Sequence, residues 1–203
     1  NRIFVSRDGG ATFAATFATP VNNAFSGVAI SSSGQFMSVI ILGGVIHRSS
    51  DYGATWTSTS VPTAIWLSVA SDNSGQKLAA PSYLLGTLSS STLVISTDGG
   101  SSWQESAVGA LQGSKSSFIS VSSNGDGSRL LATAALVADS SSTIGEGAIF
   151  FSDDSGGSWF RTDAAAAVLL PVLAELLTCQ QCCAILHPLA VIMLLPSPCQ
   201  AAG

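Results

Sequence analysis

The segment "SSDYGATW", residues 49–56, decides the fold because close relatives of it recur three more times in the chain. The related segments are "SRDGGATF" (6–13), "STDGGSSW" (96–103) and "SDDSGGSW" (152–159). Their aspartates are separated by 43, 47 and 56 residues. Repeats of this length are typical of architectures in which similar supersecondary units stack on one another. We call the four segments the box turns.

A second element recurs between the box turns. It reads "FSGVAISSSGQFMSVII" (25–41), "WLSVASDNSGQKLAA" (66–80) and "FISVSSNGDGSRLLATA" (118–134). Alternating apolar residues on both sides of a Ser/Asn/Gly turn indicate a β-hairpin. A further short strand precedes each box turn and another follows it. The sequence therefore predicts four-stranded antiparallel units, with strands A to D, in which the box turn joins strands C and D.

The residue types of the box turns suit a tight turn. An aspartate accepts hydrogen bonds from nearby backbone N–H groups, glycine tolerates a positive φ, and a closing aromatic residue buries a large apolar surface. We assign the following residues to this structural role: Ser6, Asp8, Gly10, Phe13, Ser49, Asp51, Gly53, Trp56, Ser96, Asp98, Gly100, Trp103, Ser152, Asp154, Gly156 and Trp159. The aspartates occupy equivalent turns of separate units, so we do not expect them to converge on a metal or a substrate.

This pattern resembles the Asp-box (BNR) repeat of the sialidase-like β-propeller superfamily, over residues 1–163. The chain departs from it at Phe13, where tryptophan is usual, and at Ser102 and Ser158, where threonine is usual. The resemblance implies an all-β fold: a partial β-propeller of about three and a half four-stranded antiparallel blades. It also implies that the boxes are structural and lie on the face opposite the ligand site. The superfamily includes hydrolases and non-enzymatic members.

Residues 164–203 break the repeat. They are rich in Ala, Leu and Cys, and Glu175 is their one formally charged side chain. Three interpretations remain open: a membrane-associated segment, a buried or interfacial helix pair, and sequence that is not native coding sequence. The segment contains two apolar runs, 164–174 and 182–195, and each is shorter than the roughly 20 residues that a membrane-spanning helix needs. We therefore treat 1–163 as the propeller fragment and 164–203 as a helical or disordered apolar tail.

The loops at the end opposite the box turns are the expected binding region. The B–C loops read "LGG" (42–44), "YLLGTLSSST" (83–92) and "LVADSSSTIGEGA" (136–148), so they differ in length while the A–B turns stay uniform. Variable loops on a rigid scaffold commonly carry binding function.

An active site is harder to assemble from these residues. Arg7, Arg48 and Arg129 fall at or near the box end, so an arginine cluster on the loop face is not expected, which argues against sialidase activity. Asp139 and Glu146 are the acids of the B–C loops and the candidates for a two-carboxylate glycosidase. The histidines, His47 and His187, have no evident triad partner.

Bulk composition excludes other classes. The formal net charge is −5 with only 9% charged residues, so no basic surface is expected to attract nucleic acid. All four cysteines lie in the tail: Cys179, Cys182, Cys183 and Cys199. Neighbouring cysteines without a second CxxC pair do not predict a metal site. We expect no metal and no cofactor.

These observations favour a non-catalytic binding or scaffold protein with a protein or carbohydrate ligand on the face opposite the boxes. We expect it to be extracytoplasmic or secreted. The chain begins with Asn rather than Met and reads as a fragment or a processed chain, so a missing signal peptide says nothing about secretion. Membrane association could come only from residues 164–203. The alternative is a glycoside hydrolase whose active site is incomplete in this chain.

Overall fold

The computed structural model describes residues 2–18, 24–84, 91–106, 116–138, 143–162, 184–187 and 190–194. These residues form β-strands joined by turns, and no helix occurs among them. The expected all-β fold is confirmed.

The strands group into four units, which we call blades 1 to 4. Blade 1 contains β1 (Arg2–Ser6) and β2 (Ala14–Ala18) around the first box turn. Blade 2 contains β3 (Phe25–Ile30), β4 (Met37–Gly44), β5 (Ile46–Ser49) and β6 (Thr57–Ser58). Blade 3 contains β7 (Ala64–Trp66), β8 (Ala70–Ser71), β9 (Leu78–Leu84), β10 (Ser91–Ser96) and β11 (Gln104–Glu105). Blade 4 contains β12 (Ser116–Ser123), β13 (Leu130–Ala138), β14 (Thr143–Ser152) and β15 (Phe160–Thr162).

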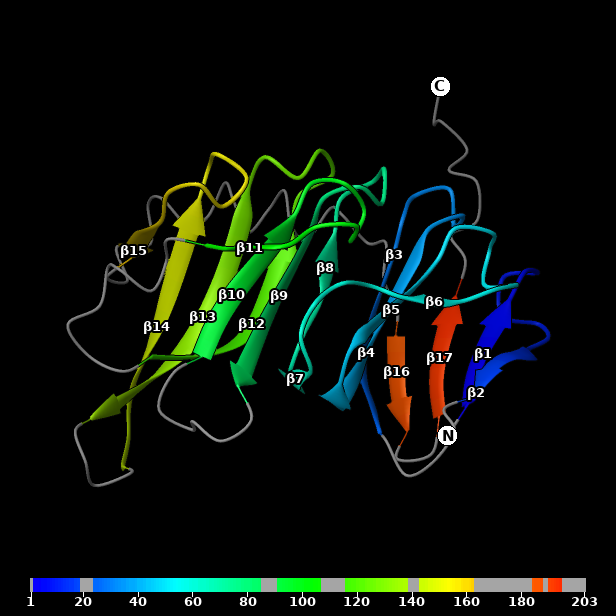
Figure 1. The fold of residues 1–203 in the computed structure, drawn as a ribbon, viewed down its shortest axis with the longest axis horizontal. Helices are drawn as coiled ribbons and strands as arrows, with labels where there is room; N and C mark the ends of the chain where they lie inside the picture. The colour runs from blue at the N-terminus through cyan, green and yellow to red at the C-terminus, as the bar shows by residue number, and fades with distance from the viewer. Residues whose placement is uncertain are drawn as a thin grey trace.

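The blades follow one another side by side, from blade 1 at one side of the molecule to blade 4 at the other (Figure 1). Within blades 2 to 4, the pairings run in the predicted antiparallel order from strand A to strand D. The arrowheads of β1, β10 and β14 point to the end at which the box turns follow, which we call the box end (Figure 1). The opposite end, with the B–C loops, is the loop end.

One pairing was not foreseen. Blades 2 and 3 belong to a single nine-stranded sheet because β4 pairs with β7 as well as with β5. The contact is made by Leu42 and Gly44, at the loop end of β4, opposite Ile65 and Ala64. The short "LGG" connection brings the end of strand B close enough to the next blade for backbone pairing.

We expected residues 164–203 to be helical or disordered, and this expectation is wrong for the part of the tail that the structure describes. Residues Ala184–His187 (β16) and Ala190–Leu194 (β17) are strands, not helix or disorder. β17 pairs parallel with β1, with Phe4 opposite Ile192, and the sheet order is β16-β17-β1-β2. Without the tail, one edge of β1 would have unpaired backbone N–H and C=O groups. The tail segment pairs with these groups as a strand, which a helix could not do. Blade 1 thereby gains two strands and becomes four-stranded. The rest of 164–203 lies outside the described residues, among which no helix is long and apolar enough to span a membrane.

The apolar core lies between blades. One buried cluster joins blade 1 to blade 2 through residues such as Val5 and Met37. A second joins blades 2 and 3 around Trp66. A third joins blades 3 and 4, where the rings of Phe118 and Phe150 meet edge to face at 5.6 Å. Each sheet is therefore stabilised by its neighbour, as stacked units require.

Candidate functional site

Each box turn is closed by hydrogen bonds from one serine and one aspartate. In the second turn, Ser49 Oγ donates to Asp51 Oδ1 at 2.8 Å and accepts the N–H of Gly53 at 2.9 Å. Asp51 Oδ1 also accepts the N–H of Thr55 at 2.8 Å, and Asp51 Oδ2 accepts the Thr55 hydroxyl at 2.5 Å. Both carboxylate oxygens are therefore engaged within their own turn.

The same bonds recur in the other three turns. The box serines are buried, and each accepts a glycine N–H at 2.7 to 2.8 Å. Ser102 and Ser158 donate to Asp98 and Asp154 at 2.6 Å, so serine makes the bond that threonine makes elsewhere. These hydroxyl and backbone donors lower the pKa of each of the four box aspartates to about 2.

The box carboxylates do not form a joint site. Each bonds within a different blade, and the described residues contain no group of three or more His, Cys, Asp or Glu side chains that could hold a metal. The closing tryptophans Trp56, Trp103 and Trp159 donate their indole N–H groups to the glycine carbonyl three residues earlier, at 3.1 to 3.2 Å. Phe13 has no such donor, and its side chain is exposed.

Side chains also connect each blade to the next box turn, a feature that the sequence did not reveal. Arg7 Nη2 donates to the Tyr52 carbonyl at 2.7 Å. Arg48 donates to the Gly99 carbonyl and, at 3.1 Å, to the Gly75 carbonyl. Lys77 Nζ donates to Ser155 Oγ at 3.2 Å. The repeat alone could not predict these contacts because the donors differ in type and position from blade to blade.

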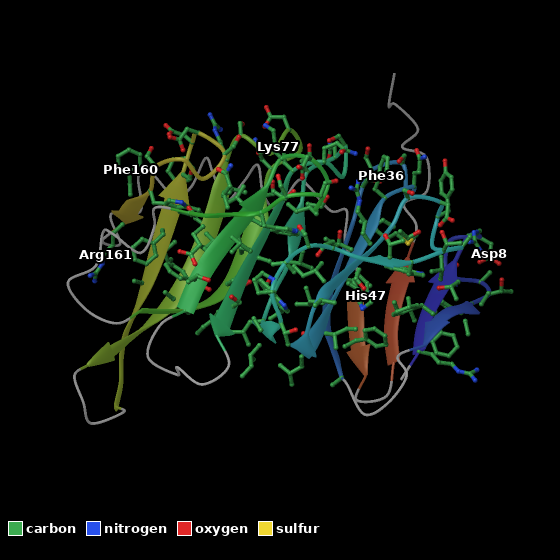
Figure 2. The ribbon with its side chains drawn as sticks, in the orientation of Figure 1. Asp8, Phe36, His47, Lys77, Phe160 and Arg161 are labelled. Carbon is green, nitrogen blue, oxygen red and sulfur yellow. The ribbon has the colours of Figure 1, made fainter. Side chains whose placement is uncertain are left out.

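A polar cleft of about 490 Å³ opens at the box end between blades 2 and 3. Arg48, on β5, lines it together with Phe36 and Gln76 from the two A–B turns. The guanidinium carbon of Arg48 lies 4.8 Å from the centre of the Phe36 ring, a cation–π distance. Phe36 and Lys77 mark the box end in Figure 2, whereas His47 lies lower on the strands.

His47 is a packing residue rather than part of a triad. Its ring lies 5.1 Å from the ring of Phe17, and its Nδ1 is buried without a hydrogen-bond partner. Burial lowers its pKa. The residues at the same place in the other blades, two before the box serine, are Phe4, Val94 and Phe150. An imidazole therefore occupies a position that is otherwise apolar.

The described part of the loop end carries mainly neutral groups, together with the exposed Arg2 at the start of β1. Trp66 Nε1 donates to the Gly44 carbonyl at 3.0 Å, and Ser26 Oγ donates to the Trp66 carbonyl at 3.0 Å. Leu42 is 44% exposed at the B–C turn of blade 2. Asp139 and residues 85–90 lie outside the described residues. The backbone of Glu146 belongs to β14, but the structure does not describe its side chain.

Blades of β-strands, antiparallel throughout in blades 2 to 4, stack side by side into an arc and define a partial β-propeller. Solved structures share this fold. The chain is similar to an ancestral GH74 enzyme, with a TM-score of 0.53 and 20% identity over 72% of this chain and 20% of that one. It is also similar to the GH74 xyloglucanase of Xanthomonas campestris (TM-score 0.50, 16% identity, 70% of this chain and 22% of that one). A third is the dihydro-heme d1 dehydrogenase NirN (TM-score 0.50, 16% identity, 73% and 30%).

At these identities the similarity shows the propeller fold alone. The chain spans less than a third of the length of each of these three structures. No protein-family model matches the sequence, and the comparison with curated proteins finds no match.

Proposed function

We propose that this chain is part of a non-catalytic binding or scaffold propeller of the Asp-box, sialidase-like superfamily, and that it is extracytoplasmic or secreted. In this proposal the box residues are structural, and a protein or glycan ligand binds at the loop end. The observation that carries it is the absence of acidic side chains from the described part of the loop end, where the exposed charged residue is Arg2 at the start of β1. Among the described residues, the aspartates belong to the box turns and the A–B turns, whereas the exposed loop-end side chain Leu42 is apolar.

A pair of surface substitutions tests which end binds. Leu42 at the loop end and Tyr52 at the box end are 44% and 45% exposed, so they form a matched pair. We expect Leu42→Asp to abolish binding to ligands identified on glycan and peptide arrays, and Tyr52→Asp to leave that binding unchanged. Loss of binding in Tyr52→Asp alone would place the ligand at the box end and overturn the proposal.

The alternative is a glycoside hydrolase, with Asp139 and Glu146 as its candidate acids. The fold supports it as well as it supports a binding protein, because two of the similar structures are GH74 enzymes. Hydrolysis of a glycan panel that is lost in both Asp139→Asn and Glu146→Gln would favour the enzyme.

A further inference from the structure

In blades 1 to 3, the residue just before the box serine packs against the box turn of the next blade, and in blade 2 this residue is charged. Val5 of blade 1 approaches Gly53, and Ile95 of blade 3 approaches Gly156. The equivalent residue of blade 2 is Arg48, which approaches Gly99. The packing position is therefore apolar at two interfaces and carries a guanidinium at the third.

The interface that contains Arg48 is also more open than the interface between blades 3 and 4. The cleft between blades 2 and 3 has a volume of about 490 Å³, whereas the corresponding space between blades 3 and 4, lined by Ile95 and Lys77, holds about 10 Å³. Clefts of about 300–1,000 Å³ are the size at which proteins hold small ligands. The space at Arg48 is large enough for a monosaccharide.

Arg48 retains hydrogen-bonding capacity. A guanidinium has five N–H donors. Nη1 and Nη2 each donate one N–H, to the Gly99 and Gly75 carbonyls respectively, which leaves a second N–H on each of them; Nε is buried, so a ligand in the cleft cannot reach it. Among the described residues Arg48 forms no ion pair. Burial lowers the pKa of Arg48, and the nearby charge of Asp98, which forms no ion pair with it, only partly offsets this effect. A carboxylate is the anion that a guanidinium binds with the best geometry.

The remaining lining is rich in neutral hydroxyl groups. It includes Ser50, Thr57, Ser58, Thr59 and Ser60, and the Gln76 amide from the neighbouring blade. Hydroxyl and amide groups both donate and accept, as the hydroxyls of a sugar do.

From these observations we infer that the cleft between blades 2 and 3 is a binding site for a carboxylated sugar, a uronic acid, whose carboxylate pairs with Arg48 and whose hydroxyls meet the Ser/Thr lining. The site lies at the box end, so it is independent of the ligand proposed for the loop end.

Calorimetric titration with glucuronate tests this inference, with glucose, acetate and N-acetylaspartate as matched probes. We expect glucuronate to bind about tenfold or more tightly than any of the other three. Arg48→Gln should weaken glucuronate binding by about 10- to 100-fold, since it removes a charge-assisted hydrogen bond. Ser58→Ala, which changes the lining and leaves Arg48 in place, should weaken it several-fold.

Arg7→Gln is the control, because Arg7 also donates to the next box turn but is exposed and does not line the cleft. It should bind glucuronate as the unaltered protein does. Glucuronate should also raise the melting temperature of the unaltered protein and of Arg7→Gln, but not that of Arg48→Gln. The inference is wrong if glucuronate does not bind, if glucose or acetate binds equally well, or if N-acetylaspartate binds as tightly, which would indicate an acidic peptide instead.

Discussion

Trp159 Nε1 donates to Ser106 Oγ at 2.6 Å, and this bond joins the box turn of blade 4 to the end of blade 3. Ser106 Oγ in turn donates to the Gly156 carbonyl at 2.8 Å. The serine hydroxyl thus satisfies a buried indole and a turn carbonyl together. The box turns are therefore bonded both within themselves and to the preceding blade.

Removal of that hydroxyl should destabilise the protein. In Ser106→Ala the indole keeps its bond to the Gly156 carbonyl at 3.1 Å, but the hydroxyl's bonds are lost. We expect the free energy of unfolding to fall by about 1 kcal/mol, the usual net value of one hydrogen bond. Urea unfolding measures it, with Ser122→Ala on an exposed strand position as the control. Equal stability of the two variants would show that the connection contributes nothing.

Replacement of His47 by phenylalanine should stabilise the protein. The buried Nδ1 has no partner, and an unsatisfied buried polar group costs about 1–3 kcal/mol. The equivalent positions hold Phe4 and Phe150, so the ring fits the architecture. Thermal unfolding should show a higher melting temperature at pH 7 for His47→Phe than for the unaltered chain.

The same variant should change the pH dependence of stability. Because burial lowers the pKa of His47, the unfolded chain takes up a proton near pH 6.5 before the folded protein does. Stability should therefore fall as the pH drops below about 6.5 in the unaltered protein, and this part of the fall should be absent in His47→Phe. An identical pH profile for both proteins would contradict the assigned environment of the imidazole.

Because β17 pairs with β1, a substitution in β17 should change the hydrogen exchange of backbone amides in β1, which lies near the other end of the sequence. β17 is a central strand, between β16 and β1, so a proline there removes an N–H that a neighbour uses. We expect Ile192→Pro to accelerate hydrogen exchange of the amides in Arg2–Ser6. Unchanged exchange in that strand would show that the tail does not cover its edge.

The repeat and its hairpins were predictable because local patterns specify them. Alternating apolar residues and a turn every 43 to 56 residues predict the strand order that blades 2 to 4 adopt. The box bonds followed from residue types alone, since serine and aspartate satisfy backbone groups only a few positions away.

What the sequence could not predict depends on contacts between distant segments. The β4–β7 pairing, the bonds from Arg48 to Gly75 and Gly99, and the cleft beside them arise from how two blades approach. The tail strands were missed for a related reason: an apolar run carries no helix or strand period of its own, and its structure depends on the open edge of β1 that it meets.

The central claim is that the box aspartates hold their turns as ionised, hydrogen-bonded carboxylates. Asp98 tests it most directly, with a pKa lowered to about 2 by the Ser102 hydroxyl and N–H and the Ser96 hydroxyl. A carboxyl with a lowered folded pKa stabilises above the unfolded value of about 3.9 and loses that stability as the pH falls toward 2. The decisive measurement is the stability of Asp98→Asn relative to the unaltered protein between pH 7 and pH 2. We predict a less stable variant at pH 7 and a difference that shrinks below pH 4; equal stability at pH 7, or a difference that does not change with pH, would contradict the claim.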